Sequence, residues 1–203
     1  MVNLSLEKGI KELVEGFIKA GCPSVRSQSI AERRQGYLDS VSLAGESESV
    51  YQVREVEIDG ATLRIYKPSA EEKLPVVIYF HGGCFVSGGF DTHDQQLRKL
   101  ANLSGAIVIA VKYRLAPEYT YPAAHDDAYN STLIIRDHCT EWGGDPNNIT
   151  IFGESAGGHN VLSLLVSKEA KGLFHKAISQ SGYTTTYSIE EAYKPKESSN
   201  TSD

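Results

Sequence analysis

One short stretch of the sequence has the residue types and the spacing of a serine nucleophile. Residues 153–158 read Gly-Glu-Ser-Ala-Gly-Gly, directly after an apolar run and directly before an apolar helical pattern. A serine at a sharp strand-to-helix turn lies at the N-terminus of the helix, where backbone N–H groups can stabilise a developing oxyanion. Glycines beside the serine leave room for this turn. We therefore expect Ser155 to be the catalytic nucleophile and the Ala156 N–H to be an oxyanion donor.

A second glycine-rich turn offers further donors for the same chemistry. His81, Gly82, Gly83 and Cys84 follow an apolar run at residues 75–80. If both apolar runs are parallel strands, both turns lie at the carboxyl edge of the sheet, where active sites of α/β proteins form. The N–H groups of Gly82 and Gly83 are then predicted to complete an oxyanion hole. The alternative for each turn is a structural bend with no catalytic part.

The pattern of apolar residues predicts the elements that position these turns. Apolar runs at residues 75–80, 107–111 and 149–152 indicate strands buried on both faces, and residues 176–180 are expected to form the next strand. Helical patterns lie between and after them, at residues 95–103, 123–138 and 156–169. Strands that alternate with helices predict an α/β protein with a mostly parallel sheet flanked by helices.

The N-terminal part is organised differently. Residues 10–18 carry apolar side chains at helical spacing, and Gly21 and Pro23 end this pattern. A polar segment follows up to about residue 47, as a second helix or a loop. Two alternating runs, at residues 50–58 and 62–66, flank an Asp-Gly pair, which predicts an antiparallel hairpin.

Composition limits the remaining functions. The 203 residues suit one domain, and the net charge of -6 argues against nucleic acid as a partner. No run reaches the roughly 20 apolar residues of a membrane-spanning helix, and charged residues interrupt the N-terminus, unlike in a secretory signal. Cys22, Cys84 and Cys139 are far apart and show no metal-ligand spacing. We therefore expect a reducing, cytoplasmic setting, no metal site and no membrane span.

Several motifs together resemble the hormone-sensitive-lipase-like carboxylesterases. In chain order they are residues 81–83 (His-Gly-Gly), 113–118 (Tyr-Arg-Leu-Ala-Pro-Glu), 144–146 (Gly-Asp-Pro) and 153–158. Residues 173–182 are also similar to type-B carboxylesterases, a related branch. The resemblance, over roughly residues 30 to 180, implies an α/β-hydrolase fold with an N-terminal cap over the acyl pocket. It also implies hydrolysis of short- to medium-chain carboxylic esters, with neither metal nor organic cofactor.

Matched residue by residue, the resemblance assigns Ser155 as the nucleophile and Gly82, Gly83 and Ala156 as the oxyanion donors. Cys84 stands where many relatives have a third glycine, and we expect its side chain only to tune the pocket. The charges of the 113–118 motif are expected to brace the active-site loops. They belong to Arg114 and Glu118.

The acid and the base of a catalytic triad are not evident. In this fold they follow the nucleophile in the order Ser, Asp or Glu, His. After Ser155 the chain has only His159, one helical turn further on, and His175, which precedes the next strand, and neither position suits a base. Glu190 and Glu191 are acids without a following histidine pattern. The earlier histidines are interpreted as structural, surface or, for the first, oxyanion-loop residues: His81, His93, His125 and His138.

These observations predict three parts: cap helices at residues 1–47, an α/β-hydrolase core at 48–187 without its last strands, and a polar, mobile tail at 188–203. The predicted function is a serine carboxylesterase that acts on small ester substrates through an acyl-enzyme on Ser155, with little activity in this chain because its base is missing. The alternatives are a non-catalytic ligand-binding protein or pseudoenzyme, and a peptidase or thioesterase. The strand at 176–180 is expected to be an open edge, suited to a homo-oligomer or a complementing chain.

Overall fold

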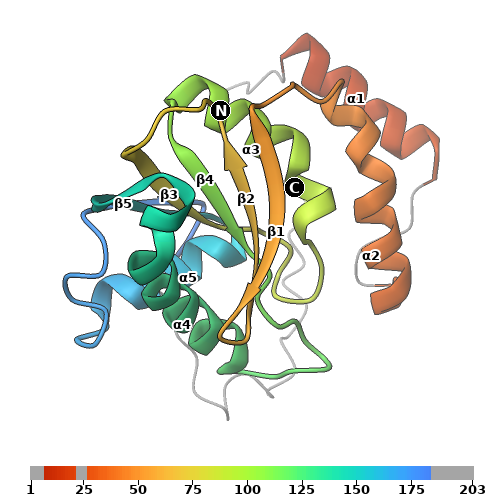
Figure 1. The fold of residues 1–203 in the computed structure, drawn as a ribbon. Coiled ribbons are helices and arrows are strands. Elements are labelled where there is room, and N and C mark those ends of the chain that lie inside the picture. Colours follow the sequence, from red (N-terminus) through yellow and green to blue (C-terminus); the bar gives the residue numbers. More distant parts are fainter. Residues whose placement is uncertain (1–6, 22–26, 184–203) are drawn as a thin grey trace, which may run out of the picture.

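The computed structural model describes residues 7–21 and 27–183, which form a twisted sheet between layers of helices (Figure 1). Within these residues the strands are β1 (Gln52–Ile58), β2 (Ala61–Lys67), β3 (Leu74–Phe80), β4 (Ile107–Val111), β5 (Gly144–Glu154) and β6 (Lys176–Gln180). The helices are α1 (Lys8–Lys19), α2 (Ile30–Asp39), α3 (Phe90–Ser104), α4 (Ala123–His138) and α5 (Ala156–Val166), with the 3-10 helices η1 (Ser40–Ala44) and η2 (Cys139–Trp142).

The strand order confirms the predicted hairpin and the mostly parallel sheet. The order is β1-β2-β4-β3-β5-β6. β1 is antiparallel to β2, which is antiparallel to β4, whereas β4, β3, β5 and β6 are all parallel. Asp59 and Gly60, with φ of 49° and 83°, form the tight turn between β1 and β2. The carboxyl ends of β3 and β5 are therefore neighbours at one edge of the sheet.

Alternate residues of each strand point to opposite faces of the sheet. Both faces carry apolar side chains, and helices cover both of them. Leu63 and Ile65 of β2 belong to the larger core cluster, which also contains residues of α4 and α5. Tyr66 of β2 and Val108 of β4 belong to the second cluster, with Leu97 of α3. Figure 1 shows α3 on one face and α4 and α5 on the other.

Several predicted elements are confirmed, while others have different ends. The strands at 107–111 and 176–180 and the helix at 123–138 have the predicted bounds. α3 begins at Phe90 rather than at residue 95, because the Thr92 hydroxyl bonds both the N–H and the carbonyl of Gly89, at 2.9 Å each, and caps an earlier turn. α5 ends before residue 169, and β5 begins before residue 149 because Gly144 already pairs with Leu74.

The predicted N-terminal helix is present as α1, but its apolar stripe is exposed. The exposed side chains include Ile10, Phe17 and Ile18, at 52%, 47% and 74%.

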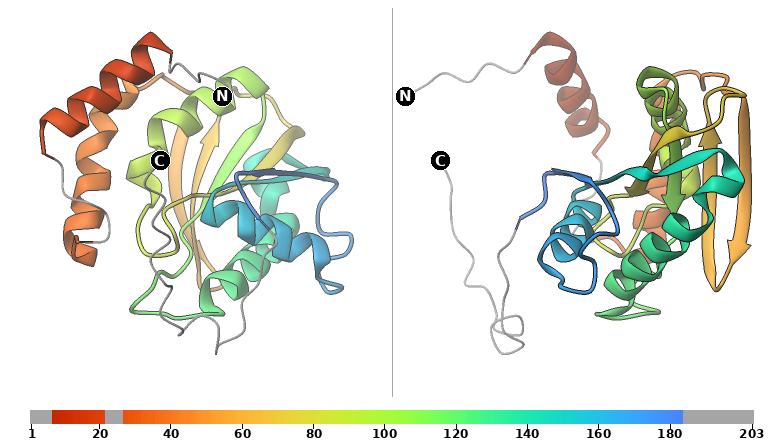
Figure 2. Two further views of the ribbon diagram at one scale, coloured as in Figure 1. Left: turned by 180° about the vertical axis from the view of Figure 1, so that it is seen from behind. Right: turned by 60° about the vertical axis from the view of Figure 1, so that its left-hand side comes forward.

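The next segment, left open between helix and loop, contains α2 and η1, which contact α3. Figure 2 shows α1 and α2 together on one side of the molecule. The cap role of residues 1–47 stays a prediction, and the predicted tail at 188–203 lies outside the described residues.

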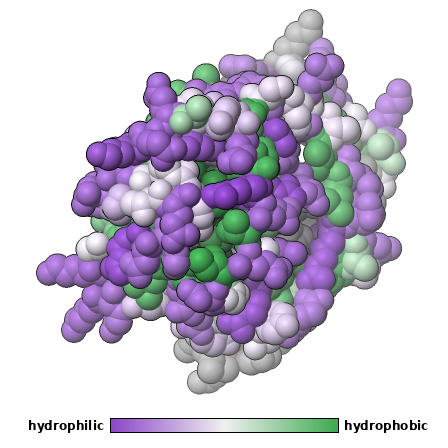
Figure 3. Space-filling model, in the orientation of Figure 1, coloured by the Kyte–Doolittle hydropathy of each residue, from purple (hydrophilic) through white to green (hydrophobic). Residues whose placement is uncertain are grey.

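The surface is largely polar on the face shown in Figure 3, where apolar side chains gather in small patches. None of the helices in the described part of the chain is both long and apolar enough to cross a membrane.

β6 lies at one edge of the sheet. In the described part of the chain its one strand neighbour is β5. The side chain of Ile178, in the middle of β6, is 51% exposed. Pairing of this edge with another chain stays a prediction.

Two leucines of α3 test the packing of this helix. Leu97 is 1% exposed and Leu103 is 78% exposed. Leu97→Ala is expected to lower the free energy of unfolding by about 2–5 kcal/mol, because it leaves a cavity in the core. Leu103→Ala is the matched control, with an expected change within about 0.5 kcal/mol. Urea unfolding monitored by circular dichroism measures both, and equal losses would contradict the packing of α3.

Candidate active site

Ser155 occupies a strained turn between β5 and α5. Its φ of 52° and ψ of -115° lie in a region that residues with a side chain rarely adopt. The turn is fixed by hydrogen bonds, since the Ser155 N–H donates to Gln180 O at 2.9 Å and the Ser155 carbonyl accepts from the His159 N–H at 3.2 Å. A strained backbone of this kind persists only where the surroundings determine it. The structure therefore places Ser155 at the sharp turn that the sequence predicted.

The glycines around Ser155 are explained by backbone packing. A Cβ built on Gly153 would overlap with the Gly157 carbonyl, and one built on Gly157 would overlap with the Phe80 carbonyl. A Cβ on Gly158 would lie 3.0 Å from Gln180 O. α5 thus begins in direct contact with the ends of β3 and β6, at a distance that only glycine permits.

The two glycine-rich turns lie side by side, as predicted. Phe80 and Gly153 are paired residues at the ends of β3 and β5. A Cβ on Gly82 would overlap with the Glu154 carboxylate, so the loop after β3 touches the residue before the nucleophile. Gly83 has a φ of 122°, and a Cβ there would overlap with the Ser87 carbonyl. We call residues 82–87 the oxyanion loop, after the function predicted for it.

The carbonyl groups around the oxyanion loop are used inside the protein. Gly83 O accepts from the N–H groups of Val86 (3.1 Å) and Ser87 (3.0 Å) and from the Ser87 hydroxyl (3.0 Å). Phe85 O accepts from the Ala116 N–H at 2.8 Å. Each bond fixes a carbonyl dipole toward its donor. The carbonyl oxygens of Gly83 and Phe85 therefore form hydrogen bonds within the protein.

The predicted oxyanion donors, by contrast, have no acceptor within the described residues. The backbone N–H groups of Gly82, Gly83 and Ala156 make no hydrogen bond there. For Ala156 this follows from its place as the first residue of α5, since the first N–H groups of a helix have no intrahelical partner. Unpaired donors on adjacent turns are what an oxyanion hole requires. Their catalytic role stays a prediction.

His81 is a buried, neutral support of the loop. Its ring stacks on the Tyr113 ring with 4.2 Å between centroids, and its Nδ1 lies 2.7 Å from Gly82 O. The Tyr113 hydroxyl donates to His81 O at 2.5 Å. Burial lowers the pKa of His81 to about 4. His81 is therefore neutral near pH 7 and positions the loop through its ring and its carbonyl.

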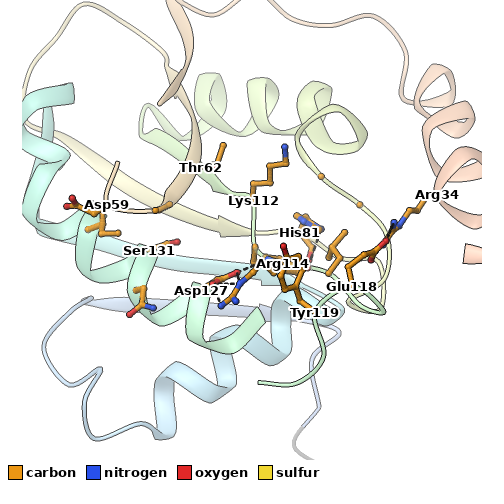
Figure 4. A pocket seen from close by; sticks show the side chains of 18 residues that line it. Arg34, Asp59, Thr62, His81, Lys112, Arg114, Glu118, Tyr119, Asp127 and Ser131 are labelled. Atoms are coloured by element: carbon orange, nitrogen blue, oxygen red, sulfur yellow. Dashed lines mark hydrogen bonds and ion pairs between the residues drawn. The ribbon is translucent and has the colours of Figure 1, made fainter. Parts of the chain in front are cut away.

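The charges of the 113–118 motif form ion pairs that brace the neighbouring segments (Figure 4). Arg114 binds both carboxylate oxygens of Asp127 on α4, at 2.8–3.0 Å. Glu118 binds Arg34 of α2 through both oxygens, at 2.7 and 2.8 Å. The hydrogen bond from Arg34 lowers the pKa of Glu118 to about 2. Both pairs are in the positions expected for bracing the loops.

The structure places neither histidine after Ser155 where the triad base would be needed. His175 is at the amino end of β6, where its Nδ1 accepts from the Ile149 N–H at 3.1 Å. Ile149 lies six residues before Ser155 on β5, which corresponds to roughly 20 Å along a strand. His159 packs its ring against Tyr183, with 4.2 Å between centroids, and makes no hydrogen bond through its side chain within the described residues. Glu190 and Glu191 lie outside the described residues.

Three residues near the site were not singled out from the sequence: Arg34, Tyr113 and Glu154. The Glu154 carboxyl touches the oxyanion loop, and burial raises its pKa. Tyr113 and Arg34 bond backbone carbonyls, and such bonds leave no pattern in the sequence. The one sequence signal for Tyr113 was its place as the first residue of the 113–118 motif.

A cavity of about 560 Å3 lies at the same edge of the sheet. It is lined by the turn at Asp59, the segment after β4, α4 and His81 (Figure 4). Ser155 is not among its lining residues. Within the described residues no cluster of three metal-binding side chains occurs.

A sheet of this topology with a serine at the turn after a central strand is the arrangement of an α/β hydrolase. A family model described as alpha/beta hydrolase fold matches residues 77–202, more than half of the chain. The chain belongs to this family, in its hormone-sensitive-lipase-like branch.

Three proteins similar to this chain are named as esterases. Carboxylesterase NlhH of Mycobacterium tuberculosis is 46% identical over 110 residues, 52% of this chain and 34% of that protein. An arylesterase of Saccharolobus solfataricus is 32% identical over 164 residues, 79% of this chain and 54% of that protein. The hyperthermophilic esterase of Pyrobaculum calidifontis has a similar structure, with a TM-score of 0.78 and 32% identity, over 86% of this chain and 58% of that one. The chain thus spans about a third to about half of these relatives.

Gly157→Ala tests the contact between α5 and β3. The new Cβ would overlap with the Phe80 carbonyl, so the backbone must shift, and we expect a loss of about 1–3 kcal/mol or more in the free energy of unfolding. Gly36→Ala on α2 is the control, because nothing lies within 4 Å of its Cβ position and its φ is ordinary. Urea unfolding of both proteins checks this. A Gly157→Ala protein as stable as the Gly36→Ala protein would contradict the contact.

The buried His81 is expected to make stability fall in mild acid. Its pKa is lowered from 6.5 to about 4, so below pH 6.5 the unfolded chain gains a proton that the folded chain gains only near pH 4. The free energy of unfolding should therefore drop by about 2 kcal/mol between pH 7 and pH 5 through this residue. Urea titrations at both pH values measure the drop.

His81→Gln is expected to reduce this pH-dependent drop, whatever its effect at pH 7. Burial also lowers the pKa of His93, so part of the drop should remain. The exposed His175→Gln is the control. A drop of the same size in His81→Gln and in the unaltered protein would show that His81 is not the titrating group.

Proposed function

We propose that this chain is the nucleophile and oxyanion-hole part of a serine carboxylesterase. The observation that carries the proposal is the contact of two turns: Ser155 at a strained strand-to-helix turn, beside a loop whose Gly82 and Gly83 N–H groups are unpaired within the described residues. A structural turn needs neither the strain at Ser155 nor unpaired donors next to it. The esterase names of the relatives support the same reaction class.

In the proposed reaction the Ser155 hydroxyl attacks the ester carbonyl. The negative charge that develops on the carbonyl oxygen is stabilised by the N–H groups of Gly82, Gly83 and Ala156. A general base takes the serine proton and passes it to the leaving alcohol, and water then releases the acid from the acyl-enzyme. Donors that are oriented before the reaction are effective because no reorganisation is needed in the transition state.

The base and the acid of this mechanism are proposed to lie outside the 203 residues. No histidine follows His175 in the sequence, and His175 and His159 are unsuited for the reasons given above. The matched esterases are longer than this chain. Additional polypeptide, in the same chain or in a partner, would also cover the open edge at β6.

The proposed substrates are small carboxylic esters with short to medium acyl chains. This class follows from the hormone-sensitive-lipase-like branch, and no metal or organic cofactor is proposed. The acyl and alcohol groups are set by a pocket that the described residues form only in part.

The experiment is hydrolysis of p-nitrophenyl butyrate, with labelling by a fluorophosphonate. In the whole protein, Ser155→Ala is expected to abolish both hydrolysis and the adduct, while Ser163→Ala on α5 keeps both. The 203-residue chain alone is expected to hydrolyse the ester near background, because loss of triad members costs on the order of a millionfold in a well-studied serine protease.

Three outcomes would change the proposal. Hydrolysis by the whole protein that survives Ser155→Ala would overturn it. Tight ligand binding without turnover or adduct in the whole protein would favour a binding protein or pseudoenzyme. Fast, Ser155-dependent turnover by the 203-residue chain would show that the base lies within it.

A further inference from the structure

Arg34 on α2 connects three separate parts of the chain around the oxyanion loop. Its Nε donates to Val86 O at 2.8 Å, and its Nη2 donates to Ala116 O at 3.1 Å. Its two terminal nitrogens also bind the two oxygens of Glu118, at 2.8 and 2.7 Å. The planar guanidinium presents its donors in a fixed fork, so one side chain can satisfy these acceptors together. Figure 4 shows the pair of Arg34 with Glu118.

The bonds from Arg34 to Val86 O and Ala116 O stabilise a loop that contains residues in strained backbone conformations. Cys84 and Phe85 have φ values of 56° and 60°, in the left-handed region that non-glycine residues avoid. Such a conformation requires contacts that hold it from outside. Phe85 O is held by the Ala116 N–H and Val86 O by Arg34. Because Arg34 also binds Ala116 O, it fixes both the loop and the segment that supports the loop.

α2 has a second attachment one helical turn further on. The Tyr37 hydroxyl lies 3.2 Å from His93 Nε2, and the Tyr37 ring packs edge-on against the His93 ring at 5.6 Å. The His93 ring lies 5.5 Å from the ring of His81, which supports the start of the oxyanion loop. Arg34 and Tyr37 therefore lie on one side of α2, three residues apart, and both face the loop.

We propose that Arg34 is a positioning residue for the oxyanion hole, and that α2 holds the oxyanion loop in place through the hydrogen bonds of Arg34. With Arg34 in place, the Val86 carbonyl is held by its guanidinium, and the N–H groups of Gly82 and Gly83 stay free of acceptors in the described residues. Without it, the strained turn at Cys84 and Phe85 relaxes. The catalytic part of this inference rests on the proposed function, whereas the effect on the loop does not.

The first test is amide hydrogen exchange of the 203-residue chain. The reporters are the Val86, Ser87 and Ala116 amides, whose hydrogen bonds hold the loop. In Arg34→Gln these amides are expected to exchange at least about tenfold faster, because hydrogen bonds to charged groups contribute on this scale. Arg33→Gln is the matched control: it makes the same change of charge at the preceding residue of α2, where the Arg33 side chain has no hydrogen bond or ion pair to described residues.

Two further variants separate positioning from general stability. Glu118→Gln keeps the bonds from Arg34 to Val86 O and Ala116 O. The exchange rates of the three loop amides in this variant should therefore lie between those of the unaltered protein and those of Arg34→Gln. Arg34→Lys should resemble Arg34→Gln, because one ammonium cannot reproduce the fork. Core amides of β3 and β4 and the melting temperature should stay as in Arg33→Gln. Equal exchange of the three loop amides in Arg34→Gln and Arg33→Gln would overturn the proposal.

The second test is the rate at which a fluorophosphonate labels Ser155 in the whole protein. Arg34→Gln is expected to slow labelling about tenfold relative to Arg33→Gln, in line with the loss of aligned oxyanion donors. Faster loop exchange with unchanged labelling would overturn the catalytic role of Arg34. If the unaltered protein is not labelled at all, the proposed function fails, and the exchange measurement still decides whether α2 holds the loop.

Discussion

The arrangement of the site depends on how closely α5 approaches the end of β3. Gly157, in the first turn of the helix, lies against the carbonyl of Phe80, where any side chain would overlap. Because the helix starts so close to the sheet, β5 must turn into it within one residue, and Ser155 takes the strained conformation of that turn. The loop after β3 leaves from the same point. The pairing of β3 with β5 makes the two turns neighbours, and the contact of Gly157 with Phe80 sets how closely α5 approaches them.

Around this contact backbone carbonyl groups have hydrogen-bond partners, and in the described part of the chain the N–H groups proposed as oxyanion donors do not. Carbonyl groups of the oxyanion loop bond to Ala116, Arg34 and the loop itself, whereas the donors proposed for the oxyanion are unpaired within the described residues. Folding therefore fixes the dipoles before any substrate binds, as electrostatic stabilisation of a transition state requires. The buried, neutral His81 contributes by stacking on Tyr113 and carries no charge near the donors.

The proposed mechanism would take two of its parts from this chain, the nucleophile and the oxyanion donors. The described residues place Ser155 next to the loop whose N–H groups are proposed to stabilise the oxyanion, and neither His159 nor His175 is in position to act as its base. In the described part of the chain β6 has a strand neighbour on one side only, and the matched esterases are longer than this chain, which agrees with the proposal of further polypeptide beside the site. His81 is among the lining residues of the cavity, whereas Ser155 is not.

The sequence by itself determined the sheet class, the hairpin, most of the core strands and the place of Ser155, because these follow from local periods and from glycines at fixed spacing. It also determined that the glycine turns after β3 and β5 would meet, since parallel neighbouring strands end at one edge. The ends of α3 and β5 were missed, because a threonine cap and a distant pairing with Leu74 decided them. Only the tertiary structure revealed Arg34, Tyr113 and Glu154, and only it showed that the α1 stripe is exposed. These features depend on contacts between segments up to 84 residues apart, which no local pattern encodes.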